Sequence, residues 1–437
     1  MRRRLTTLFV ALLALSLLLA ACGGSKSAPP AQPAPNDKAA ETPKPKEPVT
    51  VHIWSWRPQD KPLWEKVQQK LNAQGEPITI EFRGVKSTDY NSVMQTALAG
   101  GEGPDIFLTR AGAGTAEPAK AGQIIPLSDI KFEGFDEGTL SAVSHDGKVY
   151  AVPFAVQTLT FFYNKAIFDQ HGLKEPATWD ELIQLMESLK AKGVTPLAIG
   201  GKDAYAASFL VDVMAASHLG DAWIADLLAG KTNFQDPRFI EILKKANGLQ
   251  QYAQKDVMAT GQRDARTLFG TGQTAMIVDG IWAVNAYYLK TDPNIKLGSF
   301  LAPPLKAGET ARLSSYVDGG IAINAKSKVQ EAAKKIVAFT ATAEFAQMYA
   351  DLHSEIPGNR NVKFPESAPM LQRAVKQWNE VGLKLPFRIG SPLNNGTPDF
   401  STSMGANLQG LMSGKLTAEQ AAEAIQKDLA WYPPFKK

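Results

Sequence analysis

The sequence predicts a two-lobed α/β body in which β-strands alternate with α-helices. From residue 49 onward, β-branched and alternating runs are followed by segments whose apolar residues recur at helical spacing. That order is typical of a parallel sheet with helices on its faces. The body runs to residue 437, a length that suits two or three domains of about 150 residues each.

The first half of the body has the clearest alternation. The run VTVHIWSW at 49–56 predicts a strand that ends in a loop at Arg57. Leu63, Val67 and Leu71 follow at i, i+4 and i+8, which predicts a helix over 63–71. The elements expected next are a strand at 78–85, a helix at 90–99, a strand at 105–109 and extended segments across 147–164.

Capping boxes mark helix starts in the second half. Thr178 precedes Glu181 by three residues and Thr417 precedes Gln420 by three, so each pair can satisfy backbone groups at a helix N-terminus. Residues 277–282 predict a strand that turns into a helix at Gly280. The other elements expected here are strands at 195–199 and 321–323 and a helix that begins near Ser327 and ends at Phe339.

The N-terminus has the pattern of a bacterial lipoprotein signal peptide. Three arginines at 2–4 precede an apolar stretch at 8–21, which is too short to span a bilayer, since a spanning helix takes about 20 residues. The sequence LAAC at 19–22 resembles a lipobox, so we expect residues 1–21 to be removed and Cys22 to be acylated, with palmitate among its acyl chains. The alternative is ordinary secretion with Cys22 as a bystander; the position of this lone cysteine favours lipidation.

Residues 22–48 are expected to be a lipidated cysteine followed by a disordered tether. Residues 23–48 contain seven prolines and many Ala, Lys and Ser, but no Leu, Ile, Val or aromatic residue. Such a segment cannot bury enough apolar surface to fold. Its 26 residues reach roughly 30 to 80 Å between the flexible-coil and polyproline limits, enough to hold a body above a membrane.

Composition disfavours several other kinds of site. A single cysteine excludes disulfides within the mature chain and a multi-cysteine zinc site. The five histidines show neither H-x-x-x-H nor H-E-x-x-H spacing, so we expect no metal. The formal charge of +4 includes the three signal-peptide arginines and no basic block follows, so nucleic-acid binding has no electrostatic support.

A collinear series of short motifs spans most of the body. The motifs are GPDIF at 103–107, GQIIPL at 122–127, GKVYAVP at 147–153, FYNK at 162–165, PATWDEL at 176–182, GQTAM at 272–276, GIW at 280–282, DGGIAINAKSK at 318–328 and LMSGKLT at 411–417. Taken in order, they resemble the family 1 extracellular solute-binding proteins of ABC sugar importers.

The resemblance implies a periplasmic-binding-protein (clamshell) fold. Two parallel-dominated sheets flanked by helices would form two lobes joined by hinge crossings, with lobe 1 at 49–157 plus about 303–332 and lobe 2 at about 158–302 plus 333–437. It also implies a monomeric, non-enzymatic protein without cofactors on the outer face of the cytoplasmic membrane. Such a protein captures a mono- or oligosaccharide and delivers it to the permease subunits of an ABC importer.

Candidate ligand contacts are aromatic, planar and hydrogen-bonding side chains, most of which follow expected strands. Aromatic rings suit the apolar face of a sugar, and planar polar groups suit its hydroxyls. In open α/β sheets the ligand lies beyond the carboxyl ends of strands. The candidates are Trp56, Arg57, Lys86, Thr109, Arg110, Gln157, Asp203, Tyr205, Asp279, Trp282, Tyr316, Asp318 and Arg360. Core packing is the alternative for Trp56 and Trp282, and a surface ion pair is the alternative for Arg110.

Three other functions remain open at this point. An exported glycoside hydrolase would need two converging carboxylates, for which Asp203, Asp279 and Asp318 are available. A sensor subunit would share the fold and differ in its partner surface. A phosphorylated polyol or a peptide would replace the sugar, and a cluster of Arg57, Lys86 and Arg110 would favour an anion.

Overall fold

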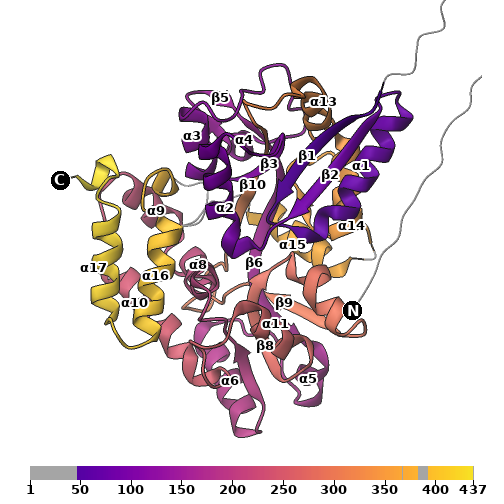
Figure 1. Ribbon diagram of the computed structural model, residues 1–437. Helices are drawn as coiled ribbons and strands as arrows, with labels where there is room; N and C mark the ends of the chain where they lie inside the picture. Colours follow the sequence, from indigo (N-terminus) through magenta and orange to yellow (C-terminus); the bar gives the residue numbers. More distant parts are fainter. Residues whose placement is uncertain (1–46, 367, 382–391, 437) are drawn as a thin grey trace, which may run out of the picture. The chain divides into compact units, whose positions relative to one another are not determined.

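A nine-stranded mixed sheet runs through the part of the chain that the computed structural model describes, residues 47–366, 368–381 and 392–436 (Figure 1). The expected signal peptide, Cys22 and nearly all of the tether lie outside these residues. The strands are β1 (Val49–Ser55), β2 (Ile78–Gly84), β3 (Ile106–Arg110), β6 (Ala151–Asn164), β7 (Thr195–Ala198), β8 (Thr274–Gly280), β9 (Leu297–Phe300), β10 (Ser314–Ile323) and β11 (Ile356–Pro357). Among these residues, no helix is both long and apolar enough to cross a membrane.

The sheet differs from the expected pair of parallel-dominated sheets. Its order is β2-β1-β3-β10-β6-β8-β7, with β9 and β11 also paired to β6, and only the β1/β2, β1/β3 and β7/β8 pairs are parallel. One sheet forms instead of two because β6 is long. Its 14 residues span about 46 Å at about 3.3 Å per residue. Its first half pairs with β10 and its second half with β8 and β9, so one strand joins both halves of the sheet.

The first hydrophobic core packs helices against β1, β3 and the start of β6. Leu63, Val67 and Leu71 are buried in it, which confirms the predicted helix face. Its helices are α1 (Lys61–Ala73), α2 (Ser87–Gly100), α3 (Ala113–Lys120), α13 (Gln330–Thr340) and α14 (Ala343–His353). We expected residues from 333 onward to join lobe 2, whereas α13 and α14 pack here, and we propose that lobe 1 includes them.

The second hydrophobic core packs a larger set of helices against β7, β8, β9 and the end of β6. Its largest buried side chains include Trp223, Phe239 and Phe400. The helices are α5 (Lys165–Gln170), α6 (Trp179–Ala191), α8 (Phe209–His218), α9 (Gly220–Leu228), α10 (Pro237–Gly248), α16 (Phe400–Met412) and α17 (Ala418–Asp428). In Figure 1, α10, α16 and α17 lie side by side. A smaller third core covers the opposite face of β8 with α11 (Gln262–Gly270) and α15 (Pro369–Val381).

Both capping boxes mark helix starts as predicted. The Thr178 side chain accepts a hydrogen bond from the Glu181 amide (3.3 Å), although Glu181 accepts in return from the amide of Ala177. The Thr417 and Gln420 box is complete, with both reciprocal bonds present.

Strand β10 is longer than predicted and carries a bulge. The prediction placed a strand at 321–323, but β10 begins at Ser314 and is buried throughout. The serines and the DGG segment lowered the apparent strand propensity, and pairing with β3 on one side and β6 on the other overrides it. The register with β6 shifts around Asp318 and Gly319, and such a bulge redirects a side chain.

Candidate ligand-binding site

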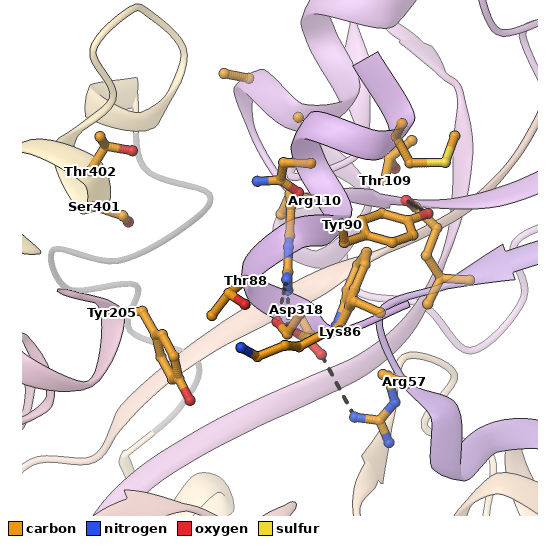
Figure 2. Close-up of a pocket in the computed structure, with 18 of the residues that line it drawn as sticks. Arg57, Lys86, Thr88, Tyr90, Thr109, Arg110, Tyr205, Asp318, Ser401 and Thr402 are labelled. Atoms are coloured by element: carbon orange, nitrogen blue, oxygen red, sulfur yellow. Dashed lines mark hydrogen bonds and ion pairs between the residues drawn. The ribbon is translucent and has the colours of Figure 1, made fainter. Parts of the chain in front are cut away.

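A cleft of about 1260 Å³ lies between the first core on one side and the second and third cores on the other. Figure 2 shows Lys86, Thr88 and Arg110 on one wall and Tyr205, Ser401 and Thr402 on the other. The first wall comes from loops that follow β1, β2 and β3, as expected for the carboxyl ends of parallel strands.

The first wall is built around the guanidinium of Arg110. This group lies 3.7 Å from the ring centroid of Trp56, donates a hydrogen bond to the Ser87 hydroxyl (2.9 Å) and lies 3.6 Å from Asp318 Oδ1 (Figure 2). Trp56 is 6% exposed and also contacts Tyr90 edge-on. The ring that we expected to stack on a sugar is therefore covered by Arg110, and the outer face of the guanidinium is what the cleft presents.

Gly319 brings β10 close enough to form this wall. A Cβ at that position would lie 2.1 Å from the Thr109 carbonyl oxygen and 2.9 Å from the Trp56 ring. The glycine thus allows strand pairing and ring packing at once. The neighbouring bulge residue, Asp318, points toward both Arg110 and Arg57 (Figure 2).

A buried ionic cluster supports the floor of the cleft. The Arg57 guanidinium donates to Asp60 (3.0 Å) and to Glu355 (2.8 Å) and lies 3.8 Å from Asp318. The second oxygen of Glu355 accepts from Gln157 and from the Tyr349 hydroxyl, both at 2.8 Å. Arg57 therefore lines the cleft, but its guanidinium already donates hydrogen bonds to carboxylates beneath the cleft.

Burial and charge act in opposite directions on these carboxyl groups. Burial raises the pKa of Asp60 and of Asp318. The positive charge of Arg57 moderates the shift of Asp60, and the charges of Arg110 and Arg57 moderate that of Asp318. Burial would also raise the pKa of Glu355, but the charge of Arg57 and the hydrogen bonds from Arg57 and Gln157 lower it below its usual value. Burial lowers the pKa of His353, so its imidazole, 3.2 Å from Asp60, favours the neutral form.

The opposite wall repeats the arrangement around Arg266 of α11. Its guanidinium donates to both oxygens of Asp279 (2.6 and 2.9 Å) and lies 4.3 Å from the ring centroid of Tyr287. Asp279 is fully buried and also accepts from the Tyr288 hydroxyl at 2.8 Å. Arg110 and Arg266 thus line the cleft from opposite sides, and each guanidinium packs on an aromatic ring and lies beside a carboxylate.

Two aromatic side chains of the opposite wall keep contact with the open cleft. Tyr205 is 37% exposed, and Trp282 is half-buried with edge contacts to Phe209 and Tyr316. The Trp282 ring folds over Gly280, where a Cβ would lie 1.7 Å from a ring carbon, so only glycine leaves room for it. These rings offer the apolar surface that a sugar face requires.

A C-terminal segment that sequence reasoning missed completes this wall. Asn394, Ser401 and Thr402 line the cleft, and Asn394 Oδ1 accepts from the Ser401 amide and hydroxyl, both at 3.1 Å. The Asn394 amide nitrogen is buried without a hydrogen-bond partner among the described residues. Arg263, Arg266 and Lys290 were also missed, since they follow no strand and their helices gave no local signal of a site.

The structure brings most of the predicted side chains together in this cleft. Those that line it are Trp56, Arg57, Lys86, Thr109, Arg110, Asp203, Tyr205, Trp282, Tyr316 and Asp318. Gln157 and Asp279 do not line it, because each is buried and bonded to a charged neighbour beneath the surface. Arg360 also lies outside it and pairs with Asp136 at 2.8 Å. Within the described ranges, no group of three or more His, Cys, Asp and Glu side chains could hold a metal ion.

Comparison with known proteins identifies relatives that bind sugars. A multiple sugar-binding protein of Streptococcus mutans is 25% identical over 81% of this chain and 82% of the relative. A diacetylchitobiose binding protein of Streptomyces coelicolor is 26% identical over 78% of each chain. The solved structure of a chitin oligosaccharide binding protein superposes with a TM-score of 0.76 at 27% identity, covering 88% of this chain and 98% of that one.

The structural match confirms the predicted two-lobed periplasmic-binding-protein fold. The family model for bacterial extracellular solute-binding proteins matches residues 54–347, which include most of the motifs on which the resemblance was based. Because this match covers more than half of the sequence, the chain belongs to the bacterial extracellular solute-binding proteins.

Proposed function

We propose that this protein is the extracytoplasmic substrate-binding lipoprotein of an ABC importer and captures a carbohydrate between its lobes. The observation that carries the proposal is that the cleft offers both kinds of surface that a sugar requires. Tyr205 and the half-buried Trp282 supply aromatic surface on one wall, and planar or hydroxyl-bearing groups such as Arg110, Thr88 and Ser401 line both walls. A sugar presents an apolar face and a hydroxyl rim that match these two surfaces.

The fixed guanidiniums favour binding without a large ordering cost. Arg110 and Arg266 are each held by a carboxylate and an aromatic ring, so little side-chain entropy is lost when they donate to a ligand oxygen. Sugar-binding relatives at 25–26% identity support the same ligand class. Closure of the lobes would follow from contacts that the ligand makes with both walls.

A thermal-shift screen of mono- and oligosaccharides tests the proposal. A captured sugar binds only the folded state and raises the apparent melting temperature by mass action. The same sugars, incubated with the purified protein, are expected to be recovered intact, since a binding protein performs no hydrolysis. Turnover of an oligosaccharide would favour the hydrolase alternative, and an absence of any stabilising carbohydrate would contradict the proposal.

Trp282→Ala is expected to weaken binding of the best sugar from that screen by about 1–3 kcal/mol. The variant removes the ring that bridges Phe209, Tyr316 and the cleft. Isothermal titration calorimetry measures the change. Trp54→Ala is the matched control, because Trp54 is half-buried but lies outside the cleft, and it should leave the affinity unchanged. Equal affinities for wild type and Trp282→Ala would remove Trp282 from the site.

We also propose that Cys22 is acylated and tethers the body to the outer face of the cytoplasmic membrane. The lipobox-like LAAC at 19–22 and the proline-rich residues after it support this anchor. Cys22→Ser is expected to move the protein from the membrane fraction to the soluble extracytoplasmic fraction while sugar binding is retained. Immunoblotting of cell fractions measures the shift, and an unchanged membrane-bound pool would count against lipidation.

A further inference from the structure

The cleft continues from the space between its two walls into a groove on the first wall. Four residues of α2 line this groove at i, i+3, i+4 and i+7, the spacing of a single helix face: Asn91, Met94, Gln95 and Leu98. Helix α3 lies beside α2 (Figure 1) and contributes Glu117 and Pro118 to the same cavity. We call the space between these two helix faces the α2/α3 groove.

The α2/α3 groove has an apolar floor and a hydrogen-bonding rim. Met94 and Leu98 are buried at its base. Asn91, Gln95 and Glu117 are exposed, and within the described ranges their side chains form no hydrogen bond or ion pair with the protein. Exposed polar side chains are ordinary on a helix, but here two helices direct them into a cavity that already contains the candidate sugar site. A sugar has an apolar face that suits such a floor and hydroxyls that suit such a rim.

The groove starts beside Arg110 and is longer than one sugar ring. Ser87, the first residue of α2, accepts a hydrogen bond from Arg110 in the cleft (2.9 Å). From Ser87 to Leu98 the helix rises about 16 Å at about 1.5 Å per residue. The whole cavity of about 1260 Å³ also exceeds the roughly 300–1000 Å³ that is usual for small-molecule sites. A monosaccharide bound between the two walls would therefore leave the groove unused.

We propose that the captured carbohydrate is an oligosaccharide whose inner units lie between the two walls and whose outer units lie in the α2/α3 groove. This proposal rests on the proposed function and specifies the length of its ligand. The amides of Asn91 and Gln95 each donate to and accept from sugar hydroxyls, and the Glu117 carboxylate accepts from them. Both helices pack in the first core, so these contacts form without movement of the opposite wall. They add affinity without favouring closure.

A length series measured by isothermal titration calorimetry tests the proposal. The probes are maltose and maltohexaose, xylobiose and xylohexaose, and diacetylchitobiose with the corresponding hexasaccharide, together with the best sugar from the thermal-shift screen and its longer homologue. In at least one series we expect the longest member to bind about tenfold tighter than the disaccharide, because it alone reaches the rim amides. Equal affinities for the short and long members of every series that binds would overturn the proposal and leave carbohydrate capture standing.

The double variant N91A/Q95A locates the effect. It is expected to lower the affinity for the long sugar about tenfold and to leave that for the disaccharide unchanged, since alanine preserves the helix and removes only the outer contacts. Q69A/Q74A is the matched control, because Gln69 of α1 and Gln74 at its C-cap are exposed amides outside the cavity, and it should change neither affinity. Equal losses for both sugars, or no loss for the long one, would contradict a role of the groove.

Small-angle X-ray scattering checks where the outer contacts lie. At saturation, the short and the long sugar should lower the radius of gyration by the same amount, because the groove belongs to one wall. A larger decrease with the long sugar would mean that its outer units bind the opposite wall as well, against the proposal. Failure of every carbohydrate in the thermal-shift screen would instead contradict the proposed function.

Discussion

Asp279→Ala is expected to lower the free energy of unfolding by about 3–5 kcal/mol, the usual cost of breaking a buried ion pair from one side. Asp279 is the one carboxylate that pairs with Arg266 within the described residues, and both side chains are almost fully buried. Its loss leaves a buried guanidinium without a counter-charge and removes the acceptor of the Tyr288 hydroxyl. Urea unfolding at neutral pH measures the difference.

A surface pair provides the control for this prediction. Lys244 and Glu419 lie 2.7 Å apart with 53% and 56% of their side chains exposed, so Glu419→Ala should leave the free energy of unfolding nearly unchanged. The double variant R266M/D279A should recover part of the loss, since it removes the stranded charge. A loss for Asp279→Ala no larger than that for Glu419→Ala would show that burial does not govern this pair.

Arg57→Met is expected to lower the free energy of unfolding by about 3–5 kcal/mol near neutral pH. Methionine keeps an unbranched apolar stem but removes the charge that lies 5.6 Å from the ring centroids of Phe154 and Tyr349 and that faces three carboxylates, Asp60, Glu355 and Asp318. Of the three carboxylates, only Asp318 then retains an arginine nearby, since Arg110 lies 3.6 Å away. Urea unfolding across a pH series measures the effect.

The stability difference between wild type and Arg57→Met should depend on pH, which identifies the carboxyl groups as its cause. Arg57 lowers the pKa of Asp60, Asp318 and Glu355, so its removal raises the folded-state pKa of all three carboxyl groups. A carboxyl group whose folded pKa lies above its unfolded pKa destabilises the fold when ionised, and this penalty disappears as protonation sets in on acidification. The gap between wild type and Arg57→Met should therefore narrow as the pH falls from neutral into the acid range, because the carboxyl groups of the variant are protonated first.

The same substitution at an exposed arginine is the control that separates this electrostatic effect from the loss of side-chain packing. Arg373 pairs with Glu175 at 2.6 Å, and both side chains are 34% exposed. Arg373→Met should cost less than about 1 kcal/mol, with no comparable change over the same pH range. A gap for Arg57→Met that stayed constant from neutral to acid pH would mean that the carboxylates of the cluster do not carry the cost.

The two buried clusters have a shared consequence for ligand capture. One lies beneath Arg110 and the other beneath Arg266, so each wall of the cleft presents a guanidinium whose position is fixed from behind. A fixed donor keeps its geometry when ligand arrives, which favours selectivity for oxygens at set positions. The stability lost in the two variants and the precision of the site therefore depend on the same contacts.

Secondary structure was largely predictable because its signals are local. The strand at 49–56, the helix face of Leu63, Val67 and Leu71, and the helix start at Thr417 appear in the structure as the spacing indicated. The prediction for β10 was too short, because its buried serines and glycines are stabilised by strands from elsewhere in the chain. Local propensity cannot register such partners.

The candidate site was predictable in part. Side chains that follow strands, such as Lys86 and Arg110, were found because parallel strands end at one edge. Arg266 and Ser401 were missed because they lie on helices whose relation to the cleft depends on packing. Asp279 was selected for its position at a strand end, but it faces inward to hold Arg266.

By itself, the sequence determined the order of strands and helices, the lipobox-like N-terminus and the collinear motifs of the solute-binding family, since these depend on residues close together in the chain. The tertiary structure alone decided that β6 and β10 join both halves of one sheet. It also decided which charged side chains form ion pairs with buried partners and which face the cleft. The reason is physical: the charge that a ligand meets depends on desolvation and pairing between residues hundreds of positions apart, as between Arg57 and Glu355.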